Sequence, residues 1–187
     1  MVMPQDLISQ TDTKMSKSVE ALSRNLDTVR TGRANPALVE GILVDYYGTP
    51  TPLIQLGSIS VPEPRVLMVQ PWDKQAVVEV EKSILKSDIG LVPNNDGTNI
   101  RINIPELTEE RRKDLAKVVR QKSEEAKVSV RNIRRDTLEQ IRGMEKDKRL
   151  SADDSRQFQA QLQKLTDQYI SNMDNIASKK EAEIMEV

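Results

Sequence analysis

The sequence predicts an α+β protein in which an antiparallel three-helix bundle is interrupted by a small α/β domain rich in strands. The first observation behind this prediction is that eight of the nine prolines and five of the seven glycines fall within residues 36–105. The second is that the flanking stretches repeat apolar residues every three or four positions, as amphipathic helices do. The third is the length of the second helical stretch, about 40 residues or about 60 Å, which predicts an elongated molecule.

The first helix is predicted from the N-terminal apolar pattern, which stops at Thr31 and Gly32. Its seam alternates steps of four and three residues, as in a coiled coil. The seam consists of Ile8, Met15, Val19, Leu22, Leu26 and Val29. Glycine suits a helix C-cap, and Pro36 discourages continuation. We therefore expect the helix to extend to about residue 31.

The proline-rich insert follows a different pattern. The segments "GILVDYYG" and "SISVPEPRVLMVQPW" predict strands broken by turns, "KQAVVEVEKSILKSD" predicts a short helix, and "TNIRINIP" predicts another strand. We therefore predict an inserted α/β domain at residues 32–105, and a bundle domain made of residues 1–31 and 106–187. Two short connections join the domains, and they predict a hinge. The hinge residues are Thr31, Gly32, Arg33, Ala34 and Pro105.

Two further helices are predicted after the insert. Thr108 opens the second, which extends to Gly143 or slightly beyond, and Ser151 with Asp153 and Asp154 opens the third. The apolar positions of the third helix are Phe158, Leu162, Leu165, Tyr169, Met173, Ile176 and Ile184. Three helices with one apolar face each bury those faces best by packing together as a bundle.

Composition excludes several classes of function. The chain has no cysteine and no histidine, so it lacks the thiolate nucleophile, the cysteine zinc site and the commonest general base. It contains no phosphate-binding glycine loop and no nucleophile elbow. We therefore expect no catalytic site, no metal and no cofactor. No apolar run is long enough for a membrane span, and "MVMPQDLISQ" lacks the features of a signal peptide, so we expect a cytoplasmic protein without a membrane partner.

Basic residues are concentrated in the second helix. The formal net charge is −1, yet residues 107–149 contain 14 basic and 9 acidic side chains. At 100° per residue, eight of the basic residues share one band, which we call the basic face. The basic face consists of Lys113, Lys117, Arg120, Lys127, Arg131, Arg134, Arg135 and Arg142. The opposite face consists of Leu115, Val118, Val119, Ala126, Val130, Ile133, Ile141 and Met144.

The basic face has two interpretations. A solvated helix laced by i to i+4 ion pairs should alternate acids within the band, but most acids lie at its edge. A continuous basic face suits a phosphate backbone, which arginine binds through its forked donors. With 3% aromatic residues and no recognition-helix motif, structured RNA is favoured over a DNA sequence. These observations leave open a coiled-coil adaptor that binds an acidic protein through the same face.

Long segments of both predicted domains carry a family resemblance. They are "VRTGRANPALVEGILVDYYGTPTPL", "LTEERRKDLAKVVRQKSEEAKVSVRNIRRD", "QKLTDQYI" and "KEAEIM". In these segments the sequence resembles the ribosome recycling factor family. The resemblance implies a three-helix bundle interrupted by a small α/β domain, in an L-shaped outline similar to transfer RNA.

The resemblance also implies a function without catalysis. Such a factor binds the 50S ribosomal subunit and its 23S rRNA after peptide release. Together with elongation factor G and the GTP that this partner binds and hydrolyses, it splits ribosomes into subunits. A monomer is expected.

The resemblance implies site residues as well. Arg112 in "TEERRK", and Arg131 and Arg134 in "VRNIRRD", are expected to contact ribosomal RNA, with Arg134 foremost. The full predicted RNA-binding set is Arg30, Arg33, Arg112, Lys113, Lys117, Arg120, Lys127, Arg131, Arg134 and Arg135. Residues expected to face elongation factor G and the small subunit are Tyr46, Gly48, Thr49 and Pro50.

Simpler structural roles stay open for the partner-facing set. One of the successive Tyr46 and Tyr47 should face the core of the insert and serve packing. Gly48 and its neighbours can be explained by turn chemistry alone. Trp72, the sole tryptophan, is expected to be a packing anchor.

Overall fold

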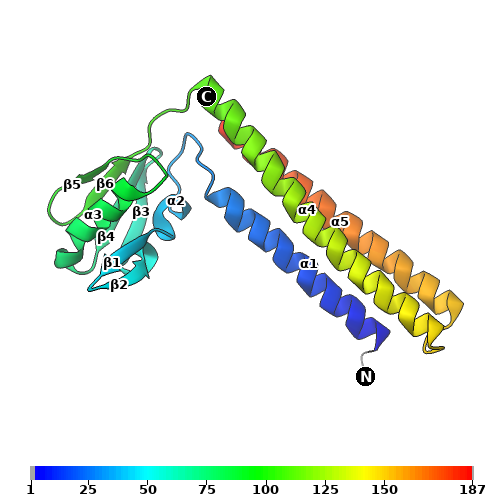
Figure 1. Ribbon diagram of the computed structural model, residues 1–187. Helices are drawn as coiled ribbons and strands as arrows, with labels where there is room; N and C mark the ends of the chain where they lie inside the picture. Colours follow the sequence, from blue (N-terminus) through cyan, green and yellow to red (C-terminus); the bar gives the residue numbers. More distant parts are fainter. Residues whose placement is uncertain (1–2, 187) are drawn as a thin grey trace. The chain divides into compact units, whose positions relative to one another are not determined.

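The computed structural model describes residues 3–186 and shows long helices together with a small antiparallel sheet domain, which confirms the α+β class (Figure 1). The chain forms two compact units. The first contains the residues up to Leu26 and Ala116–Ala182, and the second contains Asp27–Leu115 and the residues from Glu183 on. The boundaries predicted at 31/32 and 105/106 stay a prediction, and residues 1, 2 and 187 of the predicted bundle domain lie outside the described residues.

Three long helices supply the first unit. They are α1 (Pro4–Asp27), α4 (Glu109–Lys146) and α5 (Ala152–Met185). Helix α1 lies antiparallel to α4, because Thr11 contacts Thr137 and Ser18 contacts Ser129. Helices α4 and α5 are also antiparallel, and all three lie side by side in Figure 1, which confirms the predicted bundle. Among the described residues, no helix is both long and apolar enough to cross a membrane.

The bundle core is apolar with a buried hydroxyl pair. Its buried apolar residues are Leu7, Met15, Leu22, Leu26, Ala116, Val119, Val130, Ile141, Met144, Leu162, Met173 and Ala177. Thr11 Oγ1 and Thr137 Oγ1 lie 2.8 Å apart inside this core. If α1 slid along α4, the two buried hydroxyls would lose the hydrogen bond between them, so the pair favours the observed register.

Both predicted helix starts after the insert are confirmed. Arg111 N donates to Thr108 Oγ1 at 3.2 Å, directly before α4. At the start of α5, Asp154 N donates to Ser151 Oγ at 3.0 Å, and this hydroxyl donates to Asp154 Oδ2 at 2.7 Å. These bonds satisfy N–H groups that have no partner within the first helical turn.

Two details of the predicted helices were wrong. Helix α1 ends at Asp27, four residues before Thr31, because Asn35 Nδ2 reaches back to Asp27 O at 3.4 Å and the chain turns there. Val118 was placed on the core face but is 38% exposed, since it lies at the edge of the apolar band while Val119 takes the buried position.

The second unit contains two antiparallel sheets. A two-stranded sheet pairs β1 (Leu43–Tyr46) with β2 (Thr49–Pro52). The larger sheet has the order β3-β4-β6-β5. Its strands are β3 (Gly57–Glu63), β4 (Val66–Pro71), β5 (Pro93–Asn95) and β6 (Ile100–Asn103). The predicted strands of the insert are thus confirmed.

Helix α3 (Val77–Lys86) covers the core of the second unit. It buries Val77, Val80 and Ile84, which recur at helical spacing. The short helix α2 (Ala37–Glu40) was not predicted, and the single-turn segments η1 (Leu53–Gln55) and η2 (Lys74–Ala76) complete the unit. The shared core contains Leu38, Val39, Val44, Leu53, Leu67, Val69, Val77, Val80, Ile84, Ile100 and Ile102.

Candidate nucleic-acid interface

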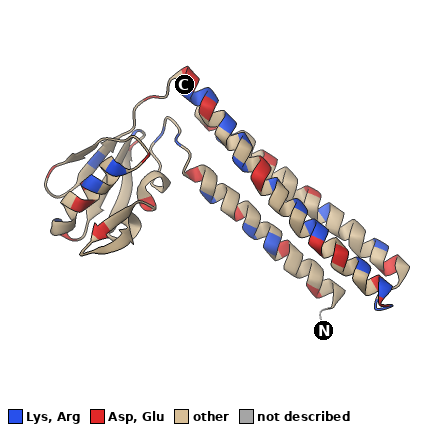
Figure 2. Ribbon diagram, viewed as in Figure 1, with Lys and Arg blue, Asp and Glu red and all other residues tan. Residues whose placement is uncertain are grey.

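Helix α4 presents the predicted basic face along a single continuous helix of 38 residues. Figure 2 shows Lys and Arg at intervals along this helix, interspersed with acidic residues. The contacts of these cations divide them into two groups. Some are held by carboxylates, whereas others keep their charge unpaired or bind a neutral amide.

Carboxylates hold Arg120 and Lys127 of the basic face. Arg120 Nε donates to both carboxylate oxygens of Glu181 at 3.1 Å, and Arg120 Nη2 donates at 2.9 Å. Lys127 pairs with Asp174, and with Glu124 at 3.0 Å, and its side chain is 13% exposed. The hydrogen bond to Glu181 raises the pKa of Arg120, and the one to Asp174 raises the pKa of Lys127. These two charges are therefore largely neutralised within the bundle.

Lys113 is held in the same way by a neighbour on its own helix. Its Nζ lies 2.8 Å from Glu109 Oε1, one turn earlier, where both side chains are exposed. A pair of this kind contributes little to stability and is screened by salt. Lys113 is therefore held less firmly than Arg120 or Lys127, although Glu109 offsets part of its charge.

Three cations of the basic face have no partner among the residues that the structure describes. They are Lys117, Arg131 and Arg142. Arg135 approaches only Asp136, at 3.6 Å, and both side chains are exposed. Arg131 and Arg135 lie one helical turn apart, so their charges add on one part of the surface.

Within the second group, Arg134 differs from the unpaired cations because a neutral side chain holds it. Its Nη1 donates to Gln163 Oε1 of α5 at 2.9 Å. Its Nε is covered and has no partner among the described residues. The half-buried Arg134 is therefore fixed in place while it keeps its full positive charge.

Sequence reasoning missed the partners that α5 supplies. Gln163, Asp174 and Glu181 each contact a cation of α4. The spacing of these three residues, 11 and 7, returns to one face of a helix, so the signal was present in the sequence.

The predicted RNA-binding and hinge residues of the second unit are engaged in local contacts. Arg30 Nη2 donates to Pro105 O at 2.9 Å, and thus joins the two connections that were predicted to form the hinge. Burial, and then the charge of Arg111, lower the pKa of Arg30. Arg33 pairs with Glu186 at 3.0 Å.

The remaining residues of this group lie in ordinary backbone surroundings. Arg112 Nη1 lies 3.5 Å from Met185 O, and its Nε is covered without a partner in the described part of the chain. Arg33 N donates to the Thr31 hydroxyl at 3.2 Å, and Ala34 N donates to Pro64 O at 2.7 Å. Gly32 does not have a positive φ. The hinge stays a prediction.

The predicted partner-facing residues lie in the β1–β2 hairpin. Tyr47 and Gly48 form its tip with φ values of 51° and 81°, and Asp45 Oδ1 accepts from Gly48 N at 2.8 Å. Turn chemistry thus accounts for Gly48. Thr49 and Pro50 follow in β2 with exposed side chains.

An aromatic cluster flanks this hairpin. The hydroxyls of Tyr46 and Tyr47 donate to Asp73 Oδ2 at 3.2 and 3.1 Å. The N–H of Gln75, and then these hydroxyls, hold the pKa of Asp73 below its ordinary value. Tyr46 packs against the core, as predicted for one of the two tyrosines, whereas Tyr47 is 72% exposed.

The prediction that Trp72 is a packing anchor was wrong. Its side chain is 72% exposed. Trp72 directly follows β4, and its backbone N–H donates to Leu56 O at 3.1 Å. The backbone is therefore held at this position while the indole ring stays in solvent.

The fold and the charged helix together define a class of protein, in which a three-helix bundle with one cationic helix carries a small inserted α/β unit. The family model described as ribosome recycling factor matches residues 22–185. The chain belongs to the ribosome recycling factor family.

Curated relatives match over almost the full length. The ribosome-recycling factor of Syntrophomonas wolfei is 52% identical over 185 residues, which cover 99% of this chain and 100% of the relative. That of Geobacillus sp. strain WCH70 is 53% identical over 185 residues, with the same coverage of both chains.

Solved structures agree. A solution structure of the ribosome recycling factor has a TM-score of 0.77 at 41% identity, with 100% of both chains covered. A second structure has a TM-score of 0.69 at 46% identity, with 99% of this chain and 100% of the other covered. It is described as models for the T. thermophilus ribosome recycling factor and the E. coli elongation factor G bound to the E. coli post-termination complex.

Proposed function

We propose that this protein binds the 50S subunit of post-termination ribosomes through 23S rRNA. With elongation factor G and the GTP bound by that partner, it then splits the ribosomes into subunits. A homologous factor bound with elongation factor G to a post-termination complex supports the assignment of both partners. The contact to RNA is assigned to the basic face of α4, with Arg134 and Arg131 at its centre.

The observation that carries this assignment is the distribution of free charge. Arg120 and Lys127 are paired with carboxylates, whereas Arg131 is unpaired and Arg134 binds only an amide. A phosphate competes poorly with a carboxylate already in place, but it meets no carboxylate partner at Arg131 or Arg134. Each neutralised phosphate also releases counterions, so binding should weaken steeply with salt.

The protein's own role is mechanical in this proposal. GTP is bound and hydrolysed by elongation factor G, and the chain itself contributes no catalytic group, metal or cofactor. Long packed helices transmit force from a contact on the α/β unit to the RNA contact on the bundle. We place this monomeric factor in the cytoplasm, where ribosomes are reused.

Sedimentation of post-termination ribosomes tests the proposal. The ribosomes are incubated with the protein, elongation factor G and GTP, and free subunits are separated on a sucrose gradient. Free subunits are expected only when all three components are present, and a non-hydrolysable GTP analogue should suppress them. Intact ribosomes in the complete mixture would contradict the proposal. Capture of acidic proteins from an RNA-free lysate, without ribosome binding, would instead favour a coiled-coil adaptor.

A further inference from the structure

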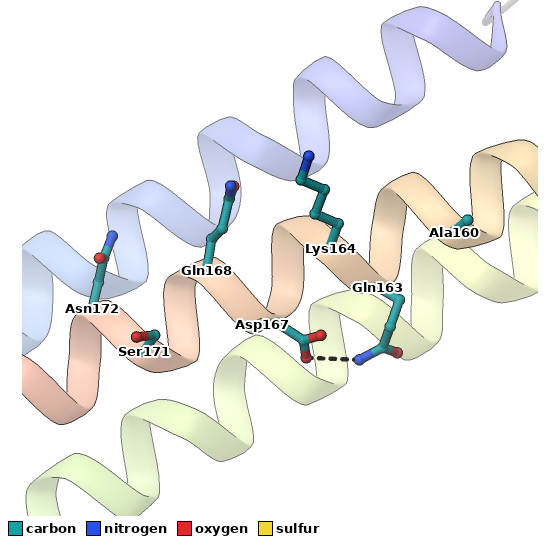
Figure 3. A pocket seen from close by; sticks show the side chains of 7 residues that line it. All are labelled: Ala160, Gln163, Lys164, Asp167, Gln168, Ser171 and Asn172. Carbon is teal, nitrogen blue, oxygen red and sulfur yellow. Dashed lines mark hydrogen bonds between the residues drawn. The ribbon is translucent and has the colours of Figure 1, made fainter.

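Two side chains of α5 form a polar chain that ends on Arg134. Gln163 Oε1 accepts from Arg134 Nη1 at 2.9 Å, and Gln163 Nε2 donates to Asp167 Oδ1 at 2.8 Å. Figure 3 shows Gln163 and Asp167 joined in this way on the flank of α5 that lies next to α4, whereas Lys164 and Gln168 extend from the other flank.

We infer that Gln163 and Asp167 are positioning residues for Arg134. They hold its guanidinium ready for a phosphate of ribosomal RNA. This inference rests on the proposed function, because it concerns how the proposed RNA contact is prepared. Neither residue was predicted from the sequence as part of the RNA-binding set.

Asp167 determines which way the Gln163 amide faces. A carboxylate accepts hydrogen bonds and does not donate them, so the amide NH₂ must face Asp167. The amide oxygen is then left for Arg134. A flipped amide would set NH₂ against the guanidinium donors and its oxygen against the carboxylate. Asp167 therefore acts on Arg134 through the orientation of Gln163.

The neutral amide also preserves the charge of Arg134. Glu181 also holds Arg120 in place, but it neutralises the guanidinium at the same time. Glutamine fixes the position of a cation without supplying a counter-charge. Immobilising a long side chain before binding reduces the entropy lost on association. Arg134 is therefore both ordered and fully charged.

The geometry determines which edge of Arg134 can meet RNA. A guanidinium has about five N–H donors. One binds Gln163, and the donor on Nε is covered, so the free donors are on Nη1 and Nη2. Arg134 consequently presents its terminal edge to a phosphate, whereas Arg120 uses Nε and Nη2 for Glu181.

Positioning and simple charge attraction predict opposite effects at Asp167. Removing a carboxylate near an RNA-binding face should strengthen binding if long-range attraction alone matters. Under the positioning role, Asp167→Ala frees the Gln163 amide to flip and weakens binding. Asp167→Asn also removes the charge, and its amide can either accept from or donate to Gln163, so it orients Gln163 only in part and should weaken binding less than Asp167→Ala.

The experiment measures binding of the full-length protein to purified 50S subunits across a series of salt concentrations. Gln163→Met should weaken binding roughly two- to tenfold with an unchanged salt slope, because Arg134 stays charged but loses its support. Gln163→Glu should weaken binding and lower the slope by about one, because Arg134 is then neutralised. Asp167→Ala should resemble Gln163→Met, and Asp167→Asn should fall between Asp167→Ala and wild type.

Gln168→Glu is the matched control. It adds the same charge as Gln163→Glu five residues further along α5, on the other flank, and should leave the salt slope unchanged. Tighter binding by Asp167→Ala, or wild-type binding by Gln163→Met, would overturn the positioning role, provided that Arg134→Ala still weakens binding. If Arg134→Ala itself binds normally, the proposed RNA face fails first. Circular dichroism checks that each variant is folded.

Discussion

Two neighbouring segments of α4 both contribute cations to the basic face but have different surroundings. At Arg120 and Lys127, carboxylates of α5 occupy the cations. About two turns later, Arg131 is unpaired and Arg134 binds only the Gln163 amide. The sequence places all four residues on one basic face, yet only the later two have charge available for a partner.

This difference shows that the charge of a helix face does not measure its capacity to bind phosphate. A carboxylate on an adjacent helix neutralises a cation by forming an ion pair, whereas an amide holds the cation and leaves its charge available. Helix α5, which packs against α4, therefore determines which cations of the basic face are available to bind phosphate. Four predictions test this comparison.

The largest effect is expected for Arg134→Ala. We expect a loss of about 1–3 kcal/mol in binding to 50S subunits, because a charged hydrogen-bonding anchor is removed. The fold should persist, since Gln163, which loses its partner Arg134, lies at the exposed surface and can bind water instead. Subunit binding measured by sedimentation checks this. Unchanged affinity of a folded variant would contradict the distinction between the two segments.

Arg131→Ala should have a smaller effect. Its exposed, unpaired side chain is expected to contribute about 1 kcal/mol and about one unit of the salt slope, as a single phosphate contact does. Affinity measured at several salt concentrations gives both quantities. Arg120→Ala is the matched control from the carboxylate-held segment, and a salt slope lowered equally in both variants would contradict the distinction.

The contribution of Lys127, in the carboxylate-held segment, to the stability of the fold should depend on pH. Its pKa is raised above the ordinary value of 10.5, chiefly by Asp174, so its contribution to stability is complete below that pH. As pH rises through the folded pKa, the proton and the contribution are lost. Chemical unfolding of wild type and Lys127→Met between pH 7 and about 12 measures this. The stability difference should change only at the alkaline end, and a change near neutral pH would disagree.

Glu181→Gln should produce the smallest effect. Arg120 would keep a hydrogen-bond acceptor but regain its charge, much as Arg134 does beside Gln163. We expect a loss of at most about 1 kcal/mol in stability, since Arg120 is largely exposed. Subunit binding should strengthen slightly and its salt slope should rise. If Glu181→Gln instead bound 50S subunits more weakly, Glu181 would be a positioning residue that holds Arg120 for contact with the subunit.

Much of the bundle could be predicted from local pattern. The seam of α1 through Met15, Leu22 and Leu26 is buried as expected, and Thr108 and Ser151 begin their helices. Such features depend on helical periodicity and on hydrogen bonds between near neighbours. The end of α1 was missed, because it depends on Asn35, which lies eight residues beyond Asp27.

The α/β unit shows the same limit. Its strands follow from alternation and turn residues, and Tyr46 packs inward as its position predicted. Trp72 was wrongly placed because apolar character alone cannot tell a core residue from an exposed one. Its exposure follows from the position at which β4 ends, which the pairing of strands fixes.

The sequence by itself determined the three amphipathic helices, the inserted domain and the concentration of arginines in "VRNIRRD". These depend on residue type and on spacing along the chain. Only the tertiary structure decided which cations of the basic face are free, because the partners Gln163, Asp174 and Glu181 come from a different helix. Contacts between residues distant in sequence arise only when helices pack, so the charge available to a partner is a property of the folded bundle.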